Sequence, residues 1–240
     1  MNKKWTRIVI VVIAAAAVAF WVFFDRQRAP ERQMDNALNA MPAWQVIKEQ
    51  EPALHQRILD QMAALQKAGE PEQQIIDTIQ PQILHLQMSR LQNAPDANVV
   101  NYMTINMEQT AAIQKVSDDA CFRFLYPMVK GGINPMRMLD KDLMARRMQA
   151  DADMMRAAYG KNRHTVTPEE RDAAVTDVRP IMKTLADKYG EDIQLLQMPE
   201  KAVGKEKLSC DMVQEMWAKV LALPEQKAAR VIRLAVSELD

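Results

Sequence analysis

The side chains best suited to chemistry in this sequence carry sulfur. Its 240 residues include two cysteines, Cys121 and Cys210. Neither lies in a CxxC motif or at a metal-ligand spacing, and an isolated pair in an exported domain is typical of one structural disulfide. We therefore expect Cys121 and Cys210 to be joined. Two unrelated buried thiols are the alternative if the domain lies in a reducing compartment.

The methionines are the second group of sulfur-containing side chains that could form a functional site. Of the 18 in the chain, one segment holds Met128, Met136, Met138, Met144, Met148, Met154 and Met155. Thioether clusters can bind Cu(I), but no His or Cys in this segment would complete a site. Met144 and Met148 are one helical turn apart and Met155 is two turns further on, which favours a packed or partner-binding stripe. We predict no metal and no cofactor; a copper-binding protein is the minor alternative.

The sequence offers little for catalysis. It contains no nucleophile elbow, no glycine-rich phosphate loop and no zinc-protease helix motif. His55 and His85 are equidistant from residue 70, so a helical hairpin could bring them together, but two histidines alone do not specify a metal site. His164 is expected in a loop. We predict that the protein is not an enzyme and assign no catalytic residue.

One apolar stretch near the start of the sequence predicts how the protein is attached to a membrane. Ile8–Phe24 contains no charged or amide side chain and as a helix would span roughly 25 Å, near the short end of what crosses a bilayer core. A cleaved signal peptide is the main alternative, but the small residues that could direct cleavage would leave too short an apolar core before them. We predict a single transmembrane helix over 8–24, preceded by a cytoplasmic tail over 1–7.

Charge and cysteine use predict the orientation. Basic residues flank the span on both sides, so the positive-inside rule favours a cytoplasmic N-terminus only mildly, and the expected disulfide favours an exported body. We therefore predict a single-pass protein of the bacterial inner membrane with a periplasmic C-terminal domain. The first 24 residues hold three of the 31 basic residues and none of the 31 acidic ones. The remainder carries a net charge of −3, which gives no electrostatic basis for binding nucleic acid.

The remainder of the chain is predicted to be all-α. It has few glycines, many strong helix formers and no period-two runs of β-branched residues. We expect a stalk over 25–51 and a bundle-like helical domain over 52–240. The predicted helices cover 52–68, 71–91 with a kink or break at Pro81, 96–116, 118 to either Pro127 or Gly131-Gly132, 135–159, 168–189 bent at Pro180, part of 191–204, 209–221 and 225–239. Ser117, Thr167 and Ser209 are the expected caps, Thr167 in a capping box with Glu170.

These features together predict a function based on protein–protein interaction. We expect a membrane-anchored, periplasm-facing scaffold or assembly factor that binds another envelope protein through an apolar or Met-rich groove. A membrane-tethered chaperone that holds unfolded clients is the alternative. No small-molecule substrate is identified from the sequence.

Overall fold

The computed structural model of the protein describes residues 35–237 except 37 and 40. Within these ranges the chain forms helices and no strand, which confirms the all-α prediction. None of these described helices is long and apolar enough to cross a membrane. The predicted span Ile8–Phe24 and the tail over 1–7 lie outside the described residues.

The described helices follow one another with short connections. They are α3 (Pro42–Gln50), α4 (Pro52–Ala68), α5 (Glu72–Asn93), α6 (Asp96–Val116), α7 (Asp118–Leu125), α8 (Pro127–Lys130), α9 (Lys141–Tyr159), α10 (Pro168–Tyr189), α11 (Glu206–Leu221) and α12 (Glu225–Ser237), with 3-10 turns η1 (Pro135–Arg137), η2 (Gly190–Leu196) and η3 (Pro199–Ala202).

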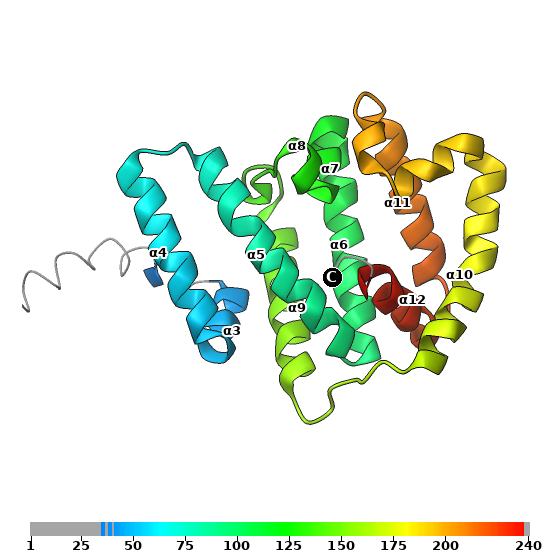
Figure 1. The fold of residues 1–240 in the computed structure, drawn as a ribbon, viewed down its shortest axis with the longest axis horizontal. Helices are drawn as coiled ribbons and strands as arrows, with labels where there is room; N and C mark the ends of the chain where they lie inside the picture. Colours follow the sequence, from blue (N-terminus) through cyan, green and yellow to red (C-terminus); the bar gives the residue numbers. More distant parts are fainter. Residues whose placement is uncertain (1–34, 37, 40, 238–240) are drawn as a thin grey trace, which may run out of the picture.

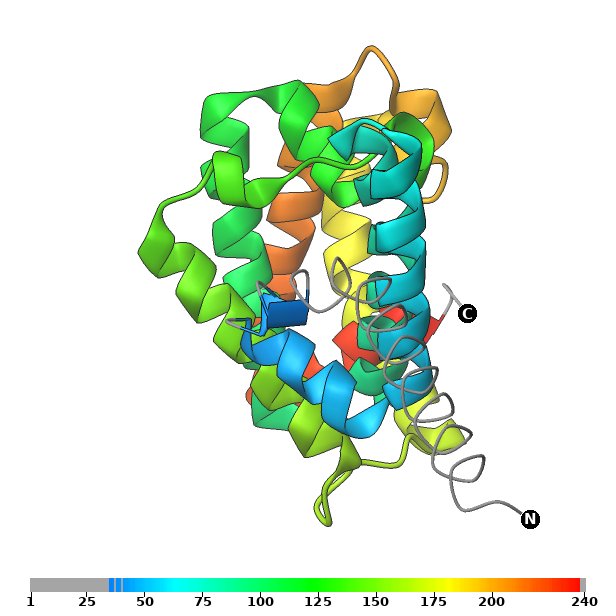
Figure 2. The same ribbon diagram turned by 90° about the vertical axis from the view of Figure 1, so that its left-hand side faces the viewer.

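The bundle is arranged around α6 and α9, which pack against each other in the middle of the molecule (Figure 1). α3 and α4 lie on one side of this pair and α10 and α11 on the other. Seen from the side of α4, α3 lies over α9 (Figure 2). α12 returns to the centre, where it packs against α5, α6 and α10. Helices from both ends of the described chain therefore share one core.

Helix α3 extends the packed body beyond the predicted domain boundary. The stalk was expected over 25–51, but α3 places Trp44, Val46 and Ile47 in the main core, each less than 5% exposed. Proline at its first position and the short apolar run make it a stable packing element despite its length. The body therefore begins no later than Pro42.

Most predicted helices form as expected, because their caps are local signals. α4 ends at Gly69, which adopts a left-handed φ of 74°. The Ser117 and Thr167 hydroxyls accept hydrogen bonds from the backbone N–H groups of Ala120 and Glu170. The Glu170 carboxylate does not complete the expected capping box but contacts His164 and Arg233.

Two expectations about helix starts are corrected by the structure. Ser209 does not cap α11, which begins at Glu206 and buries Ser209 inside the helix. The long helix expected from 135 is preceded by η1 and begins at Lys141, because Asp140 accepts a hydrogen bond from the Leu143 N–H and forms the cap. Of the kink or break expected at Pro81, the break does not occur, and α10 likewise continues through Pro180.

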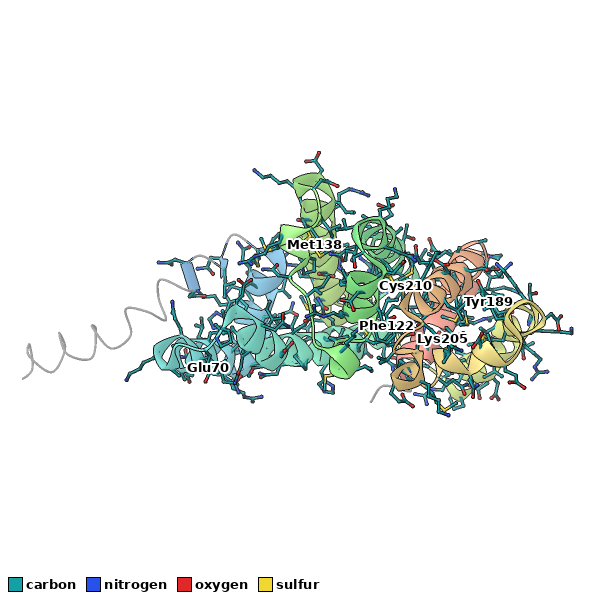
Figure 3. All side chains as sticks on the ribbon, turned by 90° about the horizontal axis from the view of Figure 1, so that it is seen from above. Glu70, Phe122, Met138, Tyr189, Lys205 and Cys210 are labelled. Carbon is teal, nitrogen blue, oxygen red and sulfur yellow. A yellow bond between two sulfur atoms is a disulfide. The ribbon has the colours of Figure 1, made fainter. Side chains whose placement is uncertain are left out.

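The predicted disulfide is confirmed. Cys121 in α7 and Cys210 in α11 are bonded, with their Cα atoms 6.4 Å apart. Both are fully buried in a second core cluster with Phe122 and Met212. In Figure 3 the labelled Phe122 and Cys210 lie together at the contact of α7 with α11. The covalent bond thus reinforces a contact between helices from distant parts of the chain.

Candidate functional site

The main candidate site is a cleft between α5 and α6. These consecutive helices diverge from the corner at Ala94 and Pro95 and form the two sides of a V (Figure 1). α5 packs instead against α4, α9 and α12, which leaves its other side facing the open V. The resulting cleft has a volume of about 660 Å³. Small-molecule sites in proteins commonly have volumes of roughly 300–1,000 Å³.

The cleft is lined mainly by apolar side chains, because α5 carries a wider apolar stripe than its helix contacts cover. Methionines contribute a flexible, polarizable part of this lining. The apolar lining comprises Ile75, Ile76, Ile79, Ile83, Leu84 and Met88 of α5, Met103 and Met107 of α6, Phe124 and Leu125 of α7, Ile133 and Met136 of the following loop, Met62 of α4, Trp217 of α11 and Val236 of α12, among others.

A buried ion pair lies in the wall of this cleft. Arg147 of α9 lines the cleft although its side chain is only 9% exposed, and its Nε lies 2.9 Å from Asp151 Oδ1. The guanidinium stacks over the Tyr102 ring at 4.4 Å. Arg147 Nη1 is buried without a hydrogen-bond partner. Asp151 Oδ1 is likewise buried without a hydrogen-bond partner, so the two side chains are held together by opposite charge behind the cleft wall.

Burial changes the titration of this cluster. It raises the pKa of Asp151 above the ordinary value for an aspartate, an effect that Arg147 opposes. Burial disfavours the charged guanidinium too, but the interactions with Asp151 and Tyr102 together outweigh burial and raise the pKa of Arg147. Burial also raises the pKa of the Tyr102 hydroxyl. Arg147 is therefore positively charged at any physiological pH.

Gln80 lies at one end of the cleft. Its side chain lines the cleft, and its Oε1 is buried without a partner. It lies against Gly132, where a Cβ would come within 2.1 Å of that oxygen. The Gly132 backbone is held to α5 because its N–H donates to Asp77 Oδ1 at 2.9 Å and its carbonyl accepts from Gln73 Nε2 at 2.9 Å. The loop after α8 thus closes one end of the cleft and covers the Gln80 oxygen.

The three methionines predicted as a stripe occupy different environments. Met155 is fully buried in the main core, whereas Met144 and Met148 are partly buried on α9. Met144 Sδ accepts a hydrogen bond from Gln109 Nε2 at 3.6 Å. None of the three lines the cleft, where other methionines lie instead. Partner binding by Met144, Met148 and Met155 stays a prediction.

The histidines are not brought together. His55 is buried beside Trp44, with its Nε2 2.9 Å from Asp35 Oδ1, whereas His85 is exposed on α5. His164 Nε2 lies 2.6 Å from Glu170 Oε2. In the described part of the chain, no group of three His, Cys, Asp or Glu side chains is arranged to hold a metal ion.

Spacing could have identified Arg147 as part of a buried face. Leu143, Arg147, Ala150 and Met154 recur at helical intervals, and all four are buried. An arginine in register with apolar residues, with an aspartate four positions later, predicts a buried pair. The cleft itself could not be found in this way, because it depends on how far α5 and α6 diverge.

Comparison of the chain with known protein families, characterised proteins and solved structures found no significant match. The interpretation of the cleft therefore depends on its geometry and chemistry.

Proposed function

We propose that the protein is a noncatalytic scaffold or assembly factor that binds an apolar group of another envelope protein in the α5–α6 cleft. The observation that carries this proposal is the cleft itself, a half-open apolar space within an otherwise packed bundle. Its mouth includes Met136, which is 53% exposed, and next to the lining residue Pro127 lies Met128, 78% exposed. Exposed apolar surface continuous with a cavity is typical of a binding site.

A membrane tether and a periplasmic location belong to the same proposal. The apolar stretch Ile8–Phe24 supports the tether, and the Cys121–Cys210 disulfide supports an oxidising compartment. A reporter that is active only after export, fused after Asp240, should be active. Activity of a reporter that works only in the cytosol would contradict this orientation.

A tethered chaperone is the second candidate. The methionines of the cleft favour it, because flexible thioether side chains can adapt to different apolar clients. The Arg147 side chain in the cleft wall, held by Asp151, favours the scaffold, since a fixed polar side chain in an apolar site restricts what can bind. The two functions differ in the number of proteins that the cleft binds.

Site-specific photocrosslinking in the native membrane distinguishes them. Benzoylphenylalanine in place of Met136, at the cleft mouth, should yield one saturable adduct that a cleft-filling Leu84→Trp substitution diminishes. Val175 on α10, an apolar residue 43% exposed and outside the cleft lining, is the matched control and should yield no such adduct. Many unrelated adducts at position 136 would favour the chaperone, and none would contradict both functions.

A further inference from the structure

We propose that the loop between α9 and α10 binds anionic phospholipid head groups of the membrane to which the chain is tethered, and so fixes how the body lies on that membrane. This inference rests on the tether of the proposed function and adds a second, separate membrane contact. Three observations carry it: unpaired basic side chains on one loop, an exposed tyrosine at the base of the loop, and a short path from the loop to the start of the described chain.

The loop carries positive charge that no partner within the described chain balances. Residues 154–168 contain no Asp or Glu. Arg156, Lys161 and Arg163 are all exposed, and among the described residues none of them forms an ion pair. Lys130, by contrast, pairs with two carboxylates. Three unpaired cations on one short segment attract a surface that carries fixed negative charge.

The nearest carboxylates do not neutralise these cations, because each already has a partner. Glu170 Oε2 lies 2.6 Å from His164 Nε2, and Glu51 at the end of α3 pairs with Arg90. Glu169 hydrogen-bonds to its own backbone in the first turn of α10. The excess positive charge of the loop therefore faces solvent.

The loop is held in a defined position on the body. The His164 backbone N–H donates to the Asn93 carbonyl at 2.7 Å and ties the loop to the end of α5, and the Arg163 N–H donates to the Gly160 carbonyl at 3.3 Å. Figures 1 and 2 both show the loop projecting beyond the helices at the end of the body where α5 meets α6. The basic side chains are thus presented on a fixed protrusion.

Tyr159 adds an aromatic side chain suited to a bilayer surface. It is 63% exposed at the end of α9, and the Arg90 guanidinium lies 4.4 Å from the centre of its ring. Tyrosine is favoured at the level of lipid head groups, because its ring is apolar and its hydroxyl is polar. Lys161 and Arg163 follow within four positions, so the ring and the cations can contact the same layer.

The start of the described chain lies near this loop. Asp35 Oδ1 lies 2.9 Å from His55 Nε2, and the His55 N–H donates to the Glu51 carbonyl at 2.9 Å. Glu51 pairs with Arg90, which stacks over Tyr159. The connection between the predicted span and Asp35 is ten residues long and reaches at most roughly 33–36 Å. The tether therefore keeps the loop within reach of the bilayer, which favours lipid over a soluble acidic partner.

Contact between the loop and the bilayer would also orient the cleft. The loop is tied through His164 to Asn93, next to the corner from which α5 and α6 diverge. In Figure 1 the V opens away from the end that carries the loop. With the loop on the membrane, the corner points to the lipid and the cleft opens towards the periplasm. A partner would then insert its apolar group from the periplasmic side.

The test places one fluorophore on the loop of the full-length chain. Asn162 is exposed between the two cations, and Asn162→Cys supplies the attachment site because the two native cysteines are bonded to each other. Nanodiscs contain a lipid with a nitroxide on its head group in phosphatidylcholine, with or without an equal amount of phosphatidylglycerol. Time-resolved fluorescence measures the quenched, docked fraction. Docking should require phosphatidylglycerol and should be lost at high salt, which screens exposed charges.

The variants separate charge from folding. Lys161→Gln with Arg163→Gln should lower the ratio of docked to undocked chains by about thirtyfold, which is about fivefold for each basic residue. Lys115→Gln with Lys201→Gln is the matched control and should leave the ratio unchanged. Both lysines are exposed without an ion pair among the described residues, and the end of α6 and η3, which carry them, lie at the opposite end of the body (Figure 1). Thermal unfolding followed by circular dichroism verifies that each variant is folded.

Each contrary outcome has a specific meaning. Equal quenching in the two lipid mixtures, or undiminished docking in the loop double variant, would overturn recognition of anionic lipid. Absence of quenching in chains that stay in the discs would overturn this inference and leave the tether intact. If benzoylphenylalanine at position 162 then gave one saturable protein adduct in the native membrane, the loop would belong to an acidic partner protein. Loss of the chain from the discs would contradict the tether and this inference with it.

Discussion

Buried arginines perform two tasks in this protein. Arg147 pairs with Asp151 of its own helix and stacks on Tyr102 in the wall of the cleft, whereas Arg233 of α12 uses both terminal nitrogens to join helices. Arg233 Nη2 donates to the Ala94 carbonyl and to Asp96 Oδ1, both at 2.7 Å. These two acceptors form the corner from which α5 and α6 diverge. Arg233 therefore fixes the vertex of the V that creates the cleft.

Replacing Arg233 should destabilise the protein strongly. Arg233→Met leaves Asp96 and Glu170 without their shared cation, and breaking a buried ion pair costs about 3–5 kcal/mol. Chemical denaturation should show this loss in the free energy of unfolding. The exposed Arg146→Met should cost less than about 1 kcal/mol. Similar losses for the two variants would show that Arg233 does not fix the corner.

Asp35 should make the stability of the N-terminal side of the bundle depend on acid pH. Partial burial acts to raise its pKa, but hydrogen bonds from Lys48, Trp44 and His55 outweigh burial and lower the pKa to about 2. Because the pKa in the folded protein lies below the ordinary aspartate value of 3.8, this stabilisation is complete above about pH 4 and is lost as the pH falls through about 2.

We expect Asp35→Ala to lower the Tm by about 3–10 °C at pH 6, since hydrogen bonds to a charged group contribute roughly 1.5–3 kcal/mol. The difference from the native chain should shrink between about pH 4 and pH 2. Thermal unfolding monitored by circular dichroism measures both effects. Asp153→Ala removes an exposed aspartate of α9 and is the control. A difference that stays constant down to pH 2 would contradict the assignment.

At the scale of elements, the interior proline of α5 lies beside the cleft. Pro81 has no N–H to donate to the Asp77 carbonyl, so α5 remains helical without one of its hydrogen bonds. Proline at such a position bends a helix. Pro81 lies between the cleft-lining residues Gln80 and Ile83. A bend here would help to hold α5 away from α6.

Pro81→Ala should stabilise the protein by about 1–3 kcal/mol and reduce the photocrosslinked adduct at position 136, because a straighter α5 narrows the cleft. Pro180→Ala is the matched control: Pro180 is also inside a long helix but is exposed on α10 and outside the cleft lining. It should stabilise the protein without changing the adduct at position 136. An unchanged adduct in Pro81→Ala would show that Pro81 does not shape the cleft.

Local sequence signals predicted the helices better than the site. The bounds of α4, α6 and α10 follow from proline at or before their first residue together with apolar periodicity, and these signals act within a few residues. Ser209 was misinterpreted as a cap, because a serine before an apolar run resembles one even inside a helix. The cleft depends on the packing of α5 against α9 and α12, which involves residues far apart in the sequence.

At the scale of the molecule, two core clusters meet along α6, α7 and α11. The main cluster contains Trp44, Tyr102 and Ile232, and the second contains Phe122 and the two cysteines. Near the disulfide, Lys130 Nζ pairs with Asp119 and Glu206 at 2.5 and 2.7 Å. One junction between the middle and the C-terminal part of the chain thus has a covalent and an ionic connection.

Reduction of the Cys121–Cys210 bond should therefore lower the stability of the whole body. The bonded residues are 89 apart in sequence, and closing a loop of that length restricts the unfolded chain by about 4–5 kcal/mol on the loop-entropy model. This is comparable with the total stability of a domain, roughly 5–15 kcal/mol. Calorimetric unfolding with and without reductant should show a marked fall in Tm. Two free thiols in the unfolded, non-reduced protein would show that the bond does not form.

The two single substitutions test whether the bond alone accounts for this effect. Cys121→Ser and Cys210→Ser should lower the Tm equally, because each removes the same bond and both sulfurs are fully buried in the same cluster. Lys130→Met removes the ionic connection at this junction and should have a much smaller effect, since exposed ion pairs contribute little. Unequal effects of the serine variants would mean that one cysteine stabilises the packing of α7 against α11 in addition to forming the bond.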